Sequence, residues 1–218
     1  PDDFRVFHIT DPHIKTSVSS RDDRLLSALC QASMAEADFV VLSGDIVDFG
    51  TADSFERAVD ILKQSRVPVF VGPGNHDVDS DGRGFDTYIS FFGPDYYTAN
   101  IGPDILFIMG NSHDGGMLNS TQIQWIERDL SESDAETKIL CIHHPLYNLD
   151  DPPLYYLDDG EALELIDICE NYEVDIVLTG HLHNDRVDEV NGTLWILTTA
   201  IGAPVSTIAS EPDHLSHG

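Results

Sequence analysis

The stretch VPVFVGPGNHD, residues 67–77, joins a short apolar run to two glycines, a proline and three polar side chains. The apolar run is typical of a buried strand, and the glycines allow the chain to turn sharply where that strand ends. An amide, an imidazole and a carboxylate gain nothing by burial, and burying any of them unpaired is costly. A plain turn accounts for the Asn and the Asp but has no use for His76. The end of this strand is therefore a candidate functional site.

Apolar runs of this kind alternate with helical periodicity along the whole chain. Apolar residues recur at i, i+3, i+4 and i+7 from Phe55 to Leu62, which predicts a helix before the strand at 67–71. Asn191-Gly192 predicts a hairpin between the last two strands. The predicted strands are 5–9, 39–42, 67–71, 96–101, 105–109, 138–142, 174–178, 186–190 and 193–197, and the predicted helices cover 25–32, 55–62, 123–130 and 162–169.

This alternation predicts the α/β class, with largely parallel pairing and with antiparallel strands in the middle and at the end of the chain. We find no repeat, linker or low-complexity segment, and 218 residues suit one domain that covers residues 1–218. The chain begins at Pro1 without a methionine and ends at HLSHG, which is consistent with a domain truncated at its C-terminus.

Acidic residues dominate the charge of the chain. Asp and Glu number 39 against 11 Lys and Arg, for a net charge of −28 and a pI near 4.2. The acidic residues are spread along a sequence with regular apolar periodicity, which argues against disorder. We expect a folded protein from a halophile, because high salt screens the repulsion between surface carboxylates. Nucleic acid is an unfavourable partner for such a surface.

The cysteines and the hydropathy give expectations about location. Cys30, Cys141 and Cys169 lie in apolar surroundings without a CxxC spacing, so we expect reduced core thiols and a cytoplasmic protein. No apolar run approaches the length of a membrane span, so no membrane partner is expected. The sequence leaves the oligomeric state open.

Polar residues suited to chemistry follow five of the predicted strands. The carboxyl ends of strands in an open α/β sheet are where ligands bind, so we expect the five clusters to converge. Imidazole, carboxylate and amide oxygen form a mixed ligand set suited to Mn, Fe or Zn. Each cluster alone is an ordinary turn or strand cap, whereas all five in order are hard to produce by chance. The clusters are DPH (11–13), GDIVD (44–48), NHD (75–77), HHP (143–145) and GHLH (180–183).

The ordered set DxH, GDxxD, GNHD, HxP and GHxH resembles the calcineurin-like metallophosphoesterase superfamily, over roughly residues 5–200. The resemblance implies an αββα sandwich of two mixed β-sheets flanked by helices, with two divalent or trivalent metal ions at the strand ends. The HHPLY stretch resembles segments whose first His is the ligand, which favours His143 over His144. By this resemblance, one ion is held by Asp11, His13 and His183, the other by Asn75, His143 and His181, and Asp45 bridges the pair.

The resemblance also implies the chemistry. A metal-bound hydroxide hydrolyses a small phosphate ester, either a diester or a monoester. His76 acts on the leaving-group oxygen and is oriented by Asp48, so these two are the predicted catalytic residues. Asp77 is expected to stabilise the loop rather than to react.

Departures from particular branches narrow the prediction. Phe49 stands where protein Ser/Thr phosphatases of the calcineurin type carry an Arg that grips phosphate. The stretches HHPLYN and GHLHND are similar to the cyclic-nucleotide phosphodiesterase and purple-acid-phosphatase-like branches. The loop at 111–117 is either a border of the substrate site or an exposed Gly-rich loop.

Two alternatives are disfavoured by the sequence. A nuclease of the same superfamily needs a basic groove, and the charge of −28 argues against one. A catalytically weak metal-binding scaffold of the same fold is expected to have lost ligands, whereas all seven ligand positions are filled here.

Overall fold

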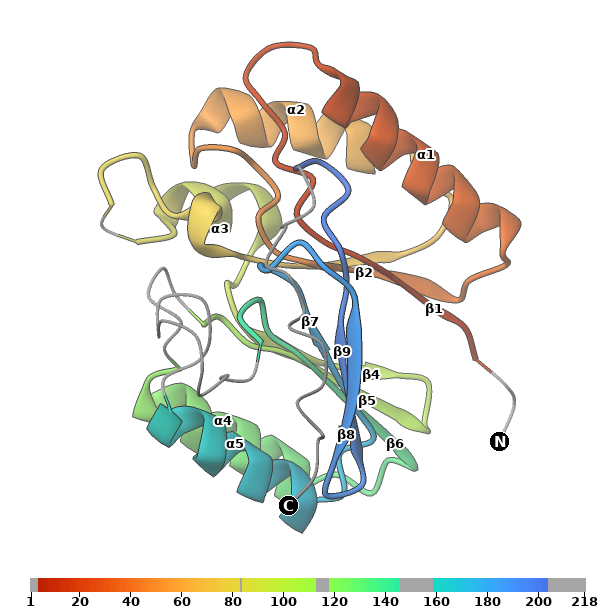
Figure 1. The fold of residues 1–218 in the computed structure, drawn as a ribbon, viewed down its shortest axis with the longest axis vertical. Helices are drawn as coiled ribbons and strands as arrows, with labels where there is room; N and C mark the ends of the chain where they lie inside the picture. Colours follow the sequence, from red (N-terminus) through yellow and green to blue (C-terminus); the bar gives the residue numbers. More distant parts are fainter. Residues whose placement is uncertain (1–3, 83, 113–117, 146–158, 204–218) are drawn as a thin grey trace, which may run out of the picture.

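The computed structural model describes residues 4–82, 84–112, 118–145 and 159–203, which form two sheets between two layers of helices (Figure 1). The strands are β1 (Val6–Ile9), β2 (Phe39–Ser43), β3 (Val69–Gly72), β4 (Tyr97–Ile101), β5 (Ile105–Met109), β6 (Thr137–Cys141), β7 (Ile176–Thr179), β8 (Arg186–Val190) and β9 (Thr193–Leu197). The helices are α1 (Ser20–Met34), α2 (Ala52–Leu62), α3 (Asp86–Phe92), α4 (Ser120–Ser131) and α5 (Asp159–Asn171), with a 3-10 turn at Asn75–Asp77.

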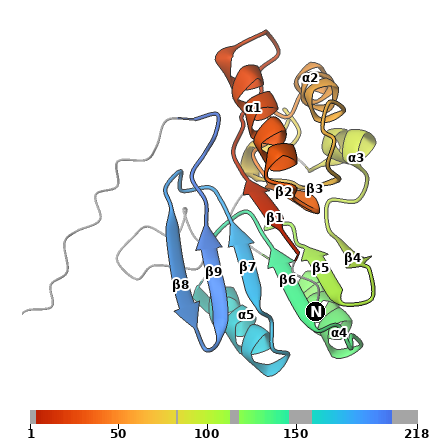
Figure 2. The ribbon, with the colours of Figure 1, turned by 90° about the vertical axis from the view of Figure 1, so that its right-hand side faces the viewer.

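The two sheets differ in their pairing. The smaller sheet has the order β1-β2-β3 and the larger one β4-β5-β6-β7-β9-β8, whose strands lie side by side in Figure 2. The α/β sandwich flanked by helices is confirmed. Only the larger sheet is mixed, however, through its antiparallel pairs β4–β5 and β8–β9, whereas both sheets were expected to be mixed. The three strands of the smaller sheet are parallel, because α1 and α2 carry the chain back between them.

Strand β2 shows why an unbroken apolar run marks the centre of the fold. Val40 and Leu42 face the core under α1 and α2, while Phe39 and Val41 face the core between the sheets. Both faces of the strand are therefore buried, and all five of its residues are inaccessible to solvent. A third apolar layer lies between the larger sheet and helices α4 and α5.

The hairpin predicted at Asn191-Gly192 is present between β8 and β9. Asn191 has a φ of 52° and Gly192 a φ of 90°, so both residues adopt the left-handed conformation that a tight hairpin turn requires. The pairing of β8 with β9 runs in register from Val190 and Thr193 at the turn to Arg186 and Leu197.

Helix α3 was not predicted from the sequence. Its apolar side packs on α2, where the Tyr88 ring meets Phe55 edge to face at 6.1 Å and the Phe92 ring meets Phe55 at 5.9 Å. The carboxylate of Asp79 accepts hydrogen bonds from the first main-chain N–H groups of the helix, at Asp86 and Thr87 (both 2.9 Å). These contacts with α2 and Asp79 hold a helix of only seven residues in place.

The burial of the cysteines matches the expectation in part. Cys141 and Cys169 are buried free thiols in the apolar layers, but Cys30 is exposed on α1, so the expectation of a core thiol is wrong at that position. Among the described residues, no helix is both long enough and apolar enough to cross a membrane.

Candidate metal centre

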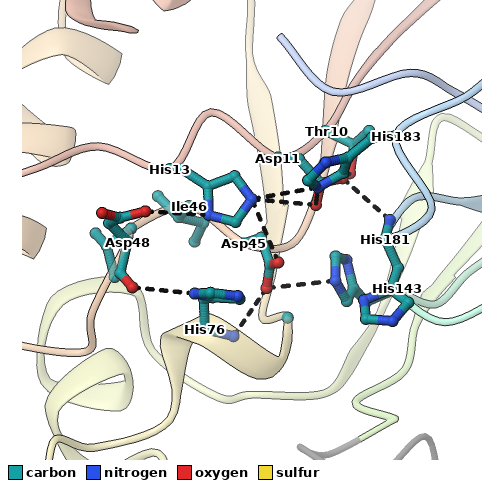
Figure 3. Close-up of polar contacts among 12 residues, drawn as sticks. Thr10, Asp11, His13, Asp45, Ile46, Asp48, His76, His143, His181 and His183 are labelled. Atoms are coloured by element: carbon teal, nitrogen blue, oxygen red, sulfur yellow. Dashed lines mark hydrogen bonds and ion pairs between the residues drawn. The ribbon is translucent and has the colours of Figure 1, made fainter. Parts of the chain in front are cut away.

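Loops that follow β1, β2 and β3 of the smaller sheet meet loops that follow β6 and β7 of the larger sheet (Figure 3). The structure thus brings the five sequence clusters to one place. Two groups within this place offer ligand atoms that all lie within 4.8 Å of one another, and each group draws on both sheets. These groups are Asp11, His13 and His183, and Asp45, His143 and His181.

In the first group, two imidazoles and a carboxylate converge. His183 Nε2 lies 3.2 Å from Asp11 Oδ1, and His13 Nε2 lies 3.6 Å from the same oxygen. The two Nε2 atoms of His13 and His183 are 3.4 Å apart. The other carboxylate oxygen of Asp11 accepts hydrogen bonds from Thr10 Oγ1 (2.6 Å) and from the main-chain N–H of His181 (3.1 Å). These bonds hold Oδ1 toward the imidazoles.

The second group contains His143 Nε2, which lies 3.3 Å from Asp45 Oδ1. His143 Nδ1 lies 2.8 Å from the carbonyl of Ser43, which can only accept, so Nδ1 carries a proton and Nε2 is the nitrogen that faces Asp45. Within the described part of the chain, the amide oxygen of Asn75 is buried and accepts no hydrogen bond. A buried amide oxygen without a donor is suited to a cation.

The neighbouring imidazole of His144 makes different contacts. His144 Nδ1 is 2.8 Å from the hydroxyl of Ser112, and the His144 ring centroid is 4.3 Å from that of His181. His143 is therefore the imidazole that lies beside Asp45. The choice of His143 over His144 as the ligand stays a prediction.

Asp45 lies between the two groups. Its Oδ2 is 3.6 Å from His13 Nε2, whereas its Oδ1 is 3.3 Å from His143 Nε2. The side chain is buried, and its Oδ1 also accepts a hydrogen bond from the main-chain N–H of His76 (2.9 Å). One carboxylate thus presents a different oxygen to each group.

The backbone at this place is strained. Among the described residues, eight other than glycine have a positive φ, and five of these are predicted ligands. Such conformations cost about 1–3 kcal/mol each and persist where the surrounding structure enforces them, often at functional sites. The five are Asp11 (54°), His13 (47°), Asp45 (49°), His181 (73°) and His183 (55°).

At two positions of the motifs the loops approach so closely that only glycine fits. A Cβ on Gly74 would lie 2.3 Å from Asp45 Oδ1, and a Cβ on Gly44 would lie 2.6 Å from His143 Nδ1. Gly44 also has a φ of 107°, which other residues rarely adopt. The glycines therefore let the loops after β2, β3 and β6 pack against one another at the site.

The electrostatics of the site favour bound cations. Burial opposes ionisation of Asp11, but the His13, His143 and His183 side chains and Thr10 hold its pKa well below the usual range. Burial of His143 lowers its pKa, but the Asp45 and Asp11 carboxylates outweigh this and raise it to about 10. The pair of buried carboxylates thus holds positive charge in the centre.

His76 lies at the rim of the centre, exposed to solvent. Its Nδ1 is 3.0 Å from the main-chain carbonyl of Asp48, so this nitrogen is a donor and Nε2 is the atom available to a ligand. The sequence predicted that Asp48 would orient His76, and the contact that Asp48 makes is through its main-chain carbonyl. The carboxylate instead bonds Arg21, which the sequence did not single out.

Asp77 is buried beneath the same loops. Its carboxylate accepts hydrogen bonds from the main-chain N–H groups of Ile46 (3.1 Å), Val47 (3.0 Å) and Gly74 (2.8 Å). Asp77 therefore ties the loop after β2 to the loop after β3, which agrees with its predicted stabilising part.

A groove of about 520 Å³ opens beside His76. Phe49, which stands at the position of the phosphate-gripping Arg, lines this groove and is 69% exposed. Thr16, Asn75 and Ser80 also line it. Of the loop at 111–117, only Asn111 and Ser112 are described, and both are buried. Residues 113–117 lie outside the described residues, as do residues 146–148 of HHPLYN.

Comparisons with known proteins agree with this fold. The profile of the calcineurin-like phosphoesterase family matches residues 4–185. The chain is 31% identical over 153 residues to a Fibrobacter succinogenes protein named a probable cyclic nucleotide phosphodiesterase, covering 65% of this chain and 57% of that protein. It is 30% identical over 186 residues to an Arcobacter nitrofigilis protein named a probable glycerophosphodiester phosphodiesterase, covering 79% of this chain and 65% of that protein.

Among solved structures, purple acid phosphatase PPD1 from yellow lupin (Lupinus luteus) seeds has the same fold. The match has a TM-score of 0.75 at 16% identity and covers 97% of this chain and 46% of that one. The chain thus spans less than two thirds of the length of each of these three proteins.

A two-sheet α/β sandwich with paired clusters of His and Asp at its strand ends defines a metallophosphoesterase fold and suggests a binuclear metal site. The chain belongs to the calcineurin-like phosphoesterase family, because the family profile covers most of its length. The resemblance identified from the sequence is therefore confirmed, and membership of this family supports hydrolase activity.

Proposed function

We propose that this protein hydrolyses small phosphodiesters at a centre of two metal ions. The observation that carries the proposal is the position of Asp45, whose two carboxylate oxygens face two separate histidine groups. A carboxylate placed in this way can bridge two cations, whereas a carboxylate in a structural ion pair needs only one partner.

The residues present fit two metal ions. Both groups offer carboxylate and imidazole atoms, and the buried amide oxygen of Asn75 supplies a neutral ligand. This donor set suits Mn, Fe or Zn. In the proposed assignment, one ion is held by Asp11, His13 and His183, the other by Asn75, His143 and His181, and both by Asp45.

When bound, two ions at such a centre supply a nucleophile from water and offset the charge on the phosphate oxygens. The protein's own contribution at the rim is His76. With Nδ1 held by the Asp48 carbonyl, Nε2 of the imidazolium form would donate a proton to the leaving-group oxygen. The groove next to His76, with its exposed Phe49, would hold the leaving group.

The preference for diesters rests on charge and on the relatives. A diester carries one negative charge near neutral pH and a monoester nearly two, so a chain of net charge −28 repels the diester less. The two relatives described above are named phosphodiesterases. The same net charge disfavours a nuclease, which must bind a polyanion.

Metal content and activity test the centre together. We expect the Mn²⁺-loaded protein to contain two ions per chain by elemental analysis and to hydrolyse bis(p-nitrophenyl) phosphate. Asp45→Asn should lose both properties. Asp60→Asn is the matched control, because it removes the same charge from an exposed carboxylate that pairs with Lys63 at 3.7 Å.

A paired assay tests the substrate class. Faster turnover of bis(p-nitrophenyl) phosphate than of p-nitrophenyl phosphate across Mn²⁺, Fe²⁺ and Zn²⁺ supports a diesterase. Faster turnover of the monoester contradicts the diester preference. Two bound ions without turnover of either ester would show a metal-binding scaffold, and one bound ion per chain would refute the bridging part of Asp45.

A further inference from the structure

Arg21 is a basic side chain of α1 that lies against the candidate metal centre. Its Nη1 donates to the main-chain carbonyl of His13 at 2.7 Å and to Asp48 Oδ1 at 2.8 Å. Both side chains of this ion pair are largely shielded from solvent, with 19% of Arg21 and 22% of Asp48 exposed. Because Arg21 forms two hydrogen bonds in a partly buried environment, it fixes the positions of its partners better than a surface ion pair would.

The first contact of Arg21 acts on a proposed metal ligand. His13 has a φ of 47°, an unfavourable conformation for a side chain of its type, and Arg21 holds the carbonyl of this same residue. His13 Nδ1 is buried and lies 3.7 Å from Asp48 Oδ1. The Nε2 atom of His13 can bind an ion only if Nδ1 carries the proton, and the nearby carboxylate favours that tautomer.

The second contact of Arg21, with Asp48, acts on the proposed general acid His76. Arg21 fixes the Asp48 side chain, and the main-chain carbonyl of Asp48 receives His76 Nδ1 at 3.0 Å. Asp48 also donates its main-chain N–H to Ile14 at 3.0 Å, so the residue is held on several sides. One arginine thus contacts the loop that carries His13 and the residue that orients His76.

The charge of Arg21 has a further effect. The chain has only 11 basic residues, and two of them, Arg21 and Lys15, lie beside Asp48, the latter with Nζ 3.8 Å from Oδ2. Asp48, His13 and His76 offer ligand atoms within 4.8 Å of one another, so an unpaired Asp48 would compete for an ion or repel a phosphate. The ion pair with Arg21 neutralises this carboxylate.

We propose that Arg21 is a positioning residue that couples the metal ligand His13 to the acid His76 through Asp48. This inference rests on the proposed function, because it gives Arg21 a part in the same reaction. A purely structural role would be different, because Arg21 would then only attach α1 to the loops that follow β1 and β2.

The test compares two diesters that differ in their leaving group. We expect Arg21→Gln to slow hydrolysis of diphenyl phosphate, whose phenolate needs protonation, roughly tenfold or more, and bis(p-nitrophenyl) phosphate by a smaller factor. The ratio of the two rates does not depend on the fraction of folded protein, so a merely destabilised variant leaves it unchanged. Arg21→Lys keeps the charge and should restore part of the ratio.

Arg57→Gln is the matched control. Arg57 forms a partly buried ion pair with Asp22 between α2 and α1, with 29% of the arginine side chain exposed. This variant should leave the ratio of rates at the wild-type value. A second measurement uses calorimetric titration of metal-free protein with Mn²⁺, in which Arg21→Gln should weaken one of two binding events by roughly tenfold, as for other partners of metal ligands.

A double-mutant cycle tests the path through Asp48. If Arg21 acts through this carboxylate, Arg21→Gln combined with Asp48→Asn should be no slower than the slower single variant. Independent, multiplicative effects would refute the coupling. An unchanged ratio and unchanged Mn²⁺ binding in Arg21→Gln, with an active wild type, would refute the positioning part while leaving the proposed function intact; an inactive wild type with two bound ions would refute the proposed function itself.

Discussion

Replacement of Asp77 by Asn should destabilise the protein more than its small change in shape suggests. Asp77 is fully buried, and its carboxylate accepts three main-chain hydrogen bonds. Oδ2 accepts from Ile46 and Gly74, while Oδ1 accepts from Val47. The amide oxygen of Asn can still accept two of these bonds. Its NH₂ group then faces the N–H of Val47, where two donors meet.

The magnitude follows from that pairing. One hydrogen bond to a charged group is lost, worth roughly 1.5–3 kcal/mol, and one buried N–H is left unsatisfied, at about 1–3 kcal/mol. Since these terms overlap, we expect the free energy of unfolding to fall by about 3–4 kcal/mol. That is a large part of the roughly 5–15 kcal/mol typical of a domain.

Urea unfolding of metal-free protein, followed by circular dichroism, measures this change at a pH well above 7, where Asp77 is ionised despite its raised pKa. Asp79→Asn is the matched control, because Asp79 accepts two main-chain N–H groups, those of Asp86 and Thr87, at the start of α3. Asn also loses one of these bonds, but at this exposed place water can replace it, so the free energy of unfolding should fall by only about 1 kcal/mol or less.

A result within about 1 kcal/mol of the wild type for Asp77→Asn would refute the reasoning. Burial and the Asp45 carboxylate raise the pKa of Asp77 to about 7, against the effect of its three hydrogen bonds. A tolerated Asn would show that this acid is already neutral in the folded protein, and therefore that it does not bind the loops as an anion.

Three further predictions concern the acid, pH and salt. His76→Asn should keep both metal ions but lose about 10²- to 10⁴-fold in rate, with a smaller loss for good leaving groups, and an equal loss for good and poor ones would contradict an acid part. Burial lowers the pKa of His8 from 6.5 to about 4, so stability present above pH 6.5 should be lost as the pH falls toward 4, by roughly 3–4 kcal/mol at most. His8→Gln should flatten that dependence in urea unfolding, and an unchanged slope would show that His8 is not responsible. The net charge of −28 predicts that the melting temperature rises as KCl increases from about 0.1 M to about 2 M, in both metal-free and metal-loaded protein. A melting temperature that stays flat or falls in both forms would rule out adaptation to high salt.

Much of the fold could be predicted because burial leaves a direct trace in the sequence. Strand β2 is apolar at four successive positions because both of its faces are covered. Helix α3 was missed because it is short and lies between Gly84 and Gly93, although the spacing of Phe85, Tyr88 and Phe92 is helical. The error at Cys30 also has a reason, since this residue lies on a different face of α1 from Leu25 and Leu29.

The residues of the candidate centre could be singled out in the sequence because each lies within a few positions after a predicted strand. Their partners were not found, because those contacts depend on the tertiary structure. Arg21 lies 27 residues from Asp48, within a helix where an Arg is ordinary. The orientation of His76 by a main-chain carbonyl instead of the Asp48 carboxylate leaves no trace in the residue types at all.

The division of each ligand group between the two sheets has a consequence for biosynthesis. Asp11 and His183 are 172 residues apart, so a chain emerging from the ribosome can form its first sheet well before either group is complete. At that stage the nascent protein presents Asp11 and Asp45 without the histidines of the second sheet. Two carboxylates with the single imidazole of His13 form an oxygen-rich set closer to what Mg²⁺ or Ca²⁺ prefers, whereas the finished centre adds three imidazoles and suits transition metals. If ions bind there as proposed, the preference for transition metals would arise only once both sheets are in place.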